Sequence, residues 1–65
     1  MEREYLKDTC NRILGWKITI GNKVYGYERN GKQVGYYDLF FKDTKDVRGR
    51  LIGRGDLLTT LIITK

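Results

Sequence analysis

The chain has no histidine, no proline and a single cysteine, and each of these absences limits its chemistry. Histidine is the usual general base near neutral pH, and without it no Cys/His zinc site is possible. The one thiol, Cys10, cannot form an internal disulfide. The eight acidic residues show no metal-binding spacing. We therefore expect a protein that is not an enzyme, carries no cofactor or metal and has no small-molecule substrate.

Long hydrophobic runs are missing as well, which bears on the compartment. The longest apolar stretch, from Leu57 to Ile63, is interrupted by Thr59 and Thr60. It is far shorter than the ~20 residues that cross a bilayer. The chain is charged from Glu2 onward, so no secretory signal is visible. We expect a cytoplasmic protein with no membrane partner, which agrees with its free thiol.

The size and charge of the chain indicate a small basic module. A chain of 65 residues forms one domain with a thin core, since folding buries only about 60% of its unfolded surface. Such a core without a covalent staple favours help from a partner or a second copy. The net charge is +5, and acids and bases cancel over residues 1–14, so the excess lies in residues 15–65. This excess favours polyanions or acidic proteins as partners.

One short pattern occurs three times and indicates the architecture. Each copy reads small residue, base, any residue, apolar residue, glycine and then Tyr or Arg, and the copies span residues 22–27, 31–36 and 49–54. Their fifth-position glycines, Gly26, Gly35 and Gly53, are 9 and 18 residues apart. A period of nine residues fits one strand and a tight turn rather than a helical hairpin.

The second copy and its flanks resemble known repeat families. Residues 26–35 resemble a single MORN-type repeat in their glycine spacing. The words Asn30-Gly31-Lys32 and Gly35-Tyr36-Tyr37-Asp38 resemble those of WG-type repeats. No tandem array accompanies them, and Val24 stands where MORN units usually carry a tyrosine. The likeness implies a β-hairpin and carries no function to this chain.

Two turn signals fix the pairing of three strands. Gly21-Asn22 and Asn30-Gly31 both suit two-residue hairpin loops, the second of type I′. The first loop predicts the pairs Ile20–Lys23, Ile18–Tyr25 and Trp16–Tyr27. The second predicts Tyr27–Val34, Gly26–Gly35, Tyr25–Tyr36 and Lys23–Asp38. Both registers place the same apolar residues on one face, and a slip of one residue would break this agreement.

We expect an α+β fold in which an N-terminal helix packs on a small antiparallel β-meander of four or five strands. Leu6, Cys10 and Ile13 have helical spacing within residues 2–14, and Gly15 is placed to end that helix. Cys10 would then be a buried thiol. The helix would cover the apolar face of the meander, with a core made of Trp16, Ile18, Tyr25, Tyr27, Val34 and Tyr36.

The single domain then divides into four parts: a helix over 1–15, a three-stranded meander over 16–41, a polar loop over 42–49, and a C-terminal hairpin or strand–helix unit over 50–65. The last segment is ambiguous. Asp56 is a possible N-cap for a helix. The β-branched residues of 57–64 favour a strand, which we prefer.

The paired glycines of the meander leave bare backbone on its second face. In many sheets a neighbouring side chain, here Tyr37 or another residue, lies over such a gap. The alternative is the close approach of a ligand or of another backbone. We favour the first explanation for Gly26 and Gly35.

A cluster of bases makes nucleic acid the first candidate partner. Residues 42–54 hold five bases and two acids, a local charge of +3, and the bases are Lys42, Lys45, Arg48, Arg50 and Arg54. Arginines between glycines suit phosphates, and tyrosines suit base stacking unless the core takes them up. We predict a small non-enzymatic module that contacts phosphates through these five side chains.

A protein–protein or self-assembling structural module, including one of viral or mobile-element origin, is the alternative. A meander leaves two unpaired edge strands, which invite another chain to extend the sheet. The apolar closing segment would supply the contact through Leu57, Leu61 and Ile63, because no covering element is evident for it. Homo-oligomers and foreign protein partners fit this alternative equally.

Overall fold

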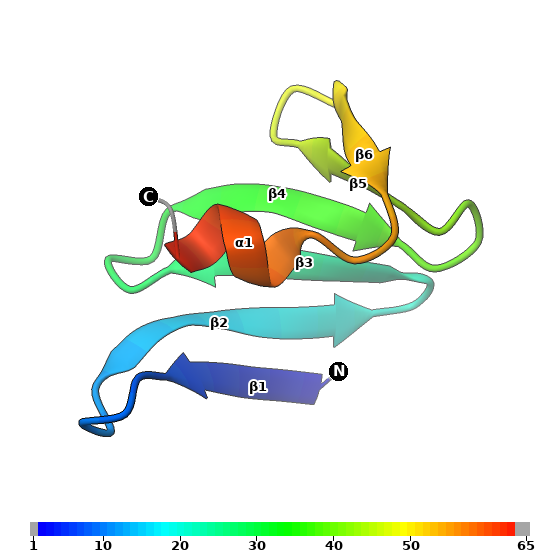
Figure 1. The fold of residues 1–65 in the computed structure, drawn as a ribbon. Coiled ribbons are helices and arrows are strands. Elements are labelled where there is room, and N and C mark those ends of the chain that lie inside the picture. Colours follow the sequence, from blue (N-terminus) through cyan, green and yellow to red (C-terminus); the bar gives the residue numbers. More distant parts are fainter. Residues whose placement is uncertain (1, 64–65) are drawn as a thin grey trace.

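The structure, a computed structural model, describes residues 2–63 as one antiparallel sheet with a short helix (Figure 1). Its strands are β1 (Glu2–Lys7), β2 (Ile13–Ile20), β3 (Lys23–Glu28), β4 (Gln33–Asp38), β5 (Asp43–Asp46) and β6 (Leu51–Arg54). They follow one another across the sheet in chain order, which makes a six-stranded meander. The helix, α1 (Leu58–Ile63), follows β6.

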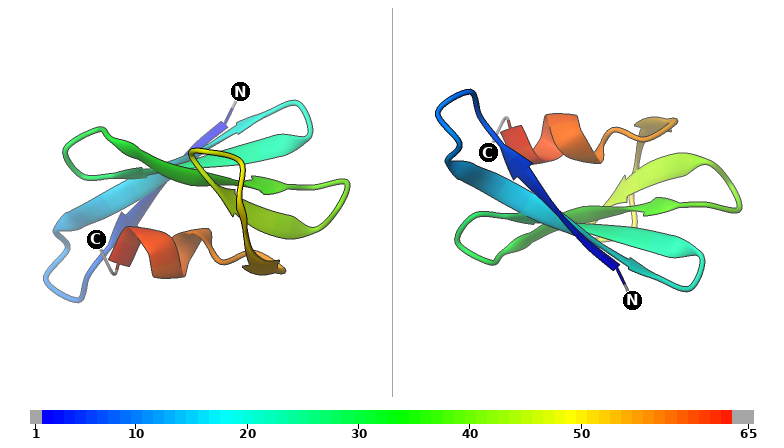
Figure 2. Two further views of the ribbon diagram at one scale, coloured as in Figure 1. Left: turned by 90° about the horizontal axis from the view of Figure 1, so that it is seen from above. Right: turned by 90° about the horizontal axis from the view of Figure 1, so that it is seen from below.

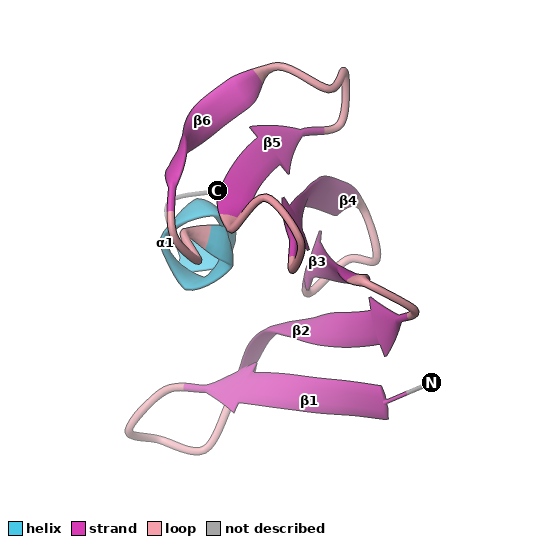
Figure 3. Cartoon of the chain, turned by 90° about the vertical axis from the view of Figure 1, so that its right-hand side faces the viewer, coloured by secondary structure: helices cyan, strands magenta, loops and turns pink. Residues whose placement is uncertain are grey.

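The sheet curves around the helix. Figure 3 shows β1 and β2 on one side of α1 and β5 and β6 on the other, with β3 and β4 between them. Figure 2 shows α1 on one face of the sheet, and no helix or strand of the described residues lies on the opposite face. We call the face under α1 the concave face and the opposite one the convex face.

The predicted N-terminal helix is wrong, because residues 2–7 form β1. This strand pairs with β2 from Glu2 opposite Thr19 to Leu6 opposite Gly15. The turn that follows is fixed by Asp8, whose Oδ1 accepts the N–H groups of Cys10 and Arg12 at 2.9 Å each. The apolar residues whose spacing suggested a helix lie on both sides of this turn and within it, so their helical spacing is a coincidence. Cys10 is exposed rather than buried.

The predicted registers of the meander are largely confirmed. All three predicted β2–β3 pairs occur. Across β3 and β4, Gly26 lies opposite Gly35, and the pairs Tyr25–Tyr36 and Lys23–Asp38 are also as predicted. The exception is Tyr27, which pairs with Gln33 because the register shifts there. Of Asn30-Gly31 only the glycine has a positive φ, at 93°, so this turn is not the predicted type I′ loop.

The prediction of which helix covers the sheet is wrong, and so is the prediction of which face that helix covers. The described core consists of Val34, Leu58 and Ile62. Two of these belong to α1, which lies on the glycine-bearing concave face. Of the residues predicted as core, only Val34 is buried, and the aromatic ones are partly exposed.

A row of glycines explains why α1 packs on the concave face. A Cβ on Gly26 would lie 3.0 Å from Leu58 Cδ2, and one on Gly53 would lie 2.8 Å from Leu57 Cδ1. A Cβ on Gly15 would meet both Tyr27 O and the Ile62 side chain. The glycines therefore let α1 pack close to this face. Of the two covers predicted for the gap, Tyr37 or another side chain, the structure shows the second, the leucines of α1.

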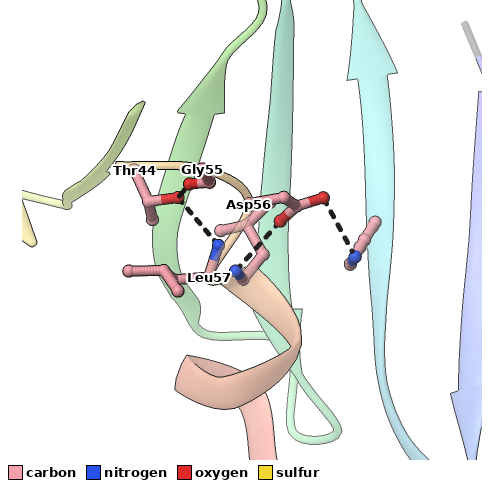
Figure 4. A network of polar contacts seen from close by, with 6 residues as sticks. Thr44, Gly55, Asp56 and Leu57 are labelled. Atoms are coloured by element: carbon pink, nitrogen blue, oxygen red, sulfur yellow. Dashed lines mark hydrogen bonds and ion pairs between the residues drawn. The ribbon is translucent and has the colours of Figure 1, made fainter. Parts of the chain in front are cut away.

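The predicted polar loop over 42–49 contains β5, and the segment after β6 is a helix rather than the preferred strand. Asp56 caps it, since its Oδ1 accepts the Leu58 N–H at 3.1 Å. Thr44, which is fully buried, donates to the Gly55 carbonyl at 2.7 Å and accepts the Leu57 N–H at 3.0 Å (Figure 4). These bonds fix the start of α1, while residue 64 lies outside the described residues.

Candidate nucleic-acid interface

The convex face carries aromatic rings on four neighbouring strands, β1 to β4. Tyr5, Trp16 and Tyr27 lie side by side on β1, β2 and β3, with ring centroids 6.1 and 5.9 Å apart. The Trp16 and Tyr27 rings are nearly parallel, at 16°. Tyr25 and Tyr36 form a second pair at 6.0 Å on β3 and β4. We call these five residues the aromatic ladder.

The ladder follows from the pleat and the register of the sheet. Side chains alternate between faces along a strand, so the pairings of Tyr5 with Trp16 and of Trp16 with Tyr27 place all three rings on one face. Along each strand, the residues next to these aromatic ones belong to the concave face, where α1 lies. Within residues 2–63 no helix or strand covers the rings of the ladder (Figure 2).

Two bases lie among these rings. The Arg3 guanidinium is 6.0 Å from the Tyr5 ring centroid and donates to the Tyr5 hydroxyl at 3.2 Å. Lys45 pairs with Tyr36 across β4 and β5, and its Nζ is 5.5 Å from the Phe41 ring centroid. The same ammonium lies 3.5 Å from Asp43 Oδ1, a buried oxygen that has no hydrogen-bond donor. Arg3 on β1 and Lys45 on β5 therefore flank the aromatic ladder at its two ends.

The five bases predicted from the sequence do not form one cluster. Lys42 and Arg54 lie at one end of the β5–β6 hairpin, where Gly55 N–H donates to the Lys42 carbonyl at 2.8 Å. Arg48 and Arg50 lie in the turn at the other end. Lys45 lies on the strand between these two ends. The hairpin thus carries positive charge along its whole length.

The turn that holds Arg48 and Arg50 is built around Asp46. Its Oδ1 accepts the N–H groups of Arg48 and Arg50 at 2.9 Å each, and its Oδ2 meets Arg50 Nε at 3.0 Å. The hydrogen bond from the Arg50 N–H, and to a smaller extent the one from the Arg48 N–H, holds the pKa of the Asp46 carboxyl below its usual range. Asp8 has the same arrangement with Arg12 and Cys10, and its pKa is lowered in the same way.

Sequence reasoning missed Arg3 and the ladder as a surface. The alternation of Arg3 and Tyr5 was a strand signal, but the helical reading of residues 2–14 concealed it. The tyrosines were identified as one face but assigned to the core. The residues proposed for protein contact, Leu57, Leu61 and Ile63, lie in or next to α1, and the first two are half-buried against the sheet.

Other parts of the described chain offer little for chemistry. A hollow of about 440 Å³ beside the start of α1 is lined by charges of both signs, and two of them, Lys17 and Asp56, already pair at 3.5 Å. Residues 2–63 contain no group of three or more Cys, Asp or Glu side chains placed to hold a metal ion. In the same part of the chain, no helix has the length and apolar character needed to cross a bilayer.

A comparison of this chain with protein-family models, curated proteins and solved structures finds no match.

Proposed function

We propose that this protein binds single-stranded nucleic acid on its convex face. The observation that supports this is the aromatic ladder, five rings that no helix or strand of residues 2–63 covers and that Arg3 and Lys45 accompany. Stacking of one base on one aromatic ring contributes about 1–3 kcal/mol and tolerates any base. Bases in a duplex are already stacked on each other, so the ladder favours single strands.

The basic groups supply the second half of the proposal. Arg3 and Lys45 lie beside the rings, where they would contact phosphates. Lys42, Arg48, Arg50 and Arg54 extend the positive surface along the β5–β6 hairpin. The net charge of +5 acts in the same direction, since it attracts a polyanion from a distance.

A titration of Trp16 fluorescence with single-stranded and duplex DNA and RNA tests the proposal. We expect single strands to quench the only tryptophan and to bind more tightly than duplexes, with affinity falling as salt rises. By fluorescence anisotropy of labelled strands, Trp16→Ala should weaken binding about tenfold, the loss of one stacked base. Phe40→Ala, which removes an exposed aromatic outside the ladder, is the matched control.

A base control separates local contacts from net charge. Arg3→Ala and Arg29→Ala remove the same charge, but Arg29 lies in the β3–β4 turn rather than beside the ladder. The proposal expects a larger loss for Arg3→Ala. No salt-sensitive binding to any nucleic acid at low ionic strength would rule the proposal out. Equal losses for Trp16→Ala and Phe40→Ala would rule out the ladder as the contact.

Sheet extension through β6 is a second candidate, because this edge strand exposes Leu51 and Ile52. Exposed apolar side chains on an unpaired edge favour pairing with another strand. Sedimentation over a concentration series should show self-association that Ile52→Lys abolishes. Ile13→Lys changes an equally exposed isoleucine on the inner strand β2 and should leave association unchanged. A monomer at every concentration would exclude this candidate.

A further inference from the structure

One end of the sheet displays apolar side chains that no described element covers. The four residues between β4 and β5 include Leu39, Phe40 and Phe41, and the two phenylalanine residues are 74% and 60% exposed. Ile20, at the end of β2, is also exposed. Figure 1 shows the β2–β3 and β4–β5 turns at the same end of the sheet, where the second projects outward. We call residues 39–42 the apolar tip.

The apolar tip is an ordered turn. Asp38 Oδ1 accepts the N–H groups of Phe40 at 2.8 Å and Phe41 at 3.1 Å. The Lys42 N–H donates to the Asp38 carbonyl at 2.7 Å, with Lys42 in the left-handed region at φ 58°. The backbone donors of the tip are therefore satisfied within the chain, so it can enter an apolar medium without leaving these groups unpaired.

A second bond ties the tip to the rest of the sheet. The Leu39 N–H donates to the Asn22 carbonyl in the β2–β3 turn at 2.8 Å. The Phe40 and Phe41 rings pack edge to face, with centroids 4.9 Å apart. The two rings thus form one apolar projection on a hydrogen-bonded turn, so the backbone of the tip is already ordered before it is buried.

Positive charge surrounds the apolar tip. Lys42 belongs to it, Lys45 Nζ lies over the Phe41 ring, and Arg54 pairs with Asp43 across β5 and β6. Lys23 follows the adjoining turn and lies opposite Asp38. The two acids nearby are occupied, since Asp38 is buried and bonded to the tip backbone and Asp43 faces Lys45.

We propose that the apolar tip docks this protein on an anionic lipid bilayer. Phe40 and Phe41 would enter the boundary between headgroups and acyl chains, while Lys42, Lys23 and Arg54 would meet the anionic headgroups. The tip is a projection with a basic rim, a shape and charge that suit a negatively charged fluid surface. Phe40 and Phe41 take no part in the proposed nucleic-acid binding by the ladder, whereas Lys42 and Arg54 belong to both positive surfaces. The docking proposal departs from the expectation of no membrane partner, which was based on the lack of a secretory signal and of an apolar run long enough to span a bilayer.

Vesicle flotation tests the docking. The probes are vesicles of phosphatidylcholine alone and vesicles that also contain phosphatidylglycerol. The wild-type protein should float only with the anionic vesicles. The double variant Phe40→Ser/Phe41→Ser should lower the bound fraction about tenfold, because two apolar side chains no longer enter the interface. Val47→Ser is the matched control, since Val47 is 57% exposed but lies in the β5–β6 turn.

A spectroscopic arm locates the contact. In a Trp16→Phe background, Phe40→Trp provides a single tryptophan at the tip. Its emission should shift to shorter wavelength on anionic vesicles and be quenched by lipids brominated on the acyl chain. Equal binding by the double variant and by Val47→Ser would overturn the proposal, because attraction by net charge would then suffice. Absence of binding to anionic vesicles at low salt, or loss of nucleic-acid binding alone in the double variant, would also overturn it.

Discussion

Gly26 and Gly35 lie opposite each other on β3 and β4, and two leucines of α1 fill the space above them. Leu58 Cδ2 would be 3.0 Å from a Cβ on the first glycine, and Leu61 Cδ1 would be 3.3 Å from a Cβ on the second. The close approach that paired strand glycines indicate is therefore made by the chain's own helix. Several stability predictions depend on this contact.

Alanine substitutions should distinguish the two glycines. A Cβ on Gly35 would collide with the Lys45 carbonyl, which is backbone, whereas one on Gly26 meets the flexible end of Leu58. We expect Gly35→Ala to lower the free energy of unfolding by about 3 kcal/mol and Gly26→Ala by about 1 kcal/mol. Urea denaturation followed by circular dichroism measures both. Equal costs would mean that the strands adjust more freely than this geometry allows.

Leu61→Lys should unfold the protein rather than release a partner. Leu61 packs over Gly35, so a lysine there would bring a charge to the contact between α1 and the sheet. We expect a loss of about 2–4 kcal/mol. Ile63→Lys, at an exposed position of the same helix, should change stability by less than about 0.5 kcal/mol. A folded Leu61→Lys protein that dissociates an oligomer would instead make α1 an interface.

Thr44→Val should weaken the start of α1. The threonine hydroxyl is buried and bonded to both Gly55 O and Leu57 N, so valine leaves two polar groups without partners. The expected cost is about 1–3 kcal/mol in urea denaturation. Thr44→Ser keeps the hydroxyl and should retain most of the stability. If serine costs as much as valine, packing of the methyl group is the cause rather than these bonds.

Acid should destabilise the fold through Asp8, Asp38 and Asp46. Backbone N–H groups bond these carboxylates and lower their pKa values, so the folded state favours their charged forms. Their contribution is complete above the unfolded pKa of about 3.9 and is lost as pH falls through the lower folded values. Urea midpoints should be level between about pH 5 and 7 and fall below about pH 4. The double variant Asp8→Asn/Asp46→Asn should fall less steeply over this acidic range.

The pairing of β2, β3 and β4 was predictable because two independent signals agree there. Turn residues at 21–22 and 30–31 and the alternation of Trp16 to Ile20 indicate the same register. The shift at Tyr27 was not predictable, since it depends on a turn in which only Gly31 has a positive φ. Strand pairing thus follows from local residues, while the detail of each turn does not.

The positions of the helix and of the core could not be predicted from the sequence in the same way. Alternation tells which side chains share a face but not which face is covered, and aromatic residues suggest a core wherever they gather. Steric fit determines which face is covered, because only the face with Gly15, Gly26, Gly35 and Gly53 lets a helix pack at short distance. The candidate site could not be predicted for the same reason. The aromatic ladder became a candidate only because no helix or strand of residues 2–63 covers its face.

The meander order of the strands has a consequence for how the molecule forms. Each strand pairs with the one made just before it, so the sheet can assemble stepwise from local hairpins, which is a rapid mode of folding. Helix α1 is the exception, because it returns from the end of β6 to lie over β2, β3 and β4. The glycine row therefore stays open to water until α1 docks, and the six helical residues close the concave face in a single long-range step.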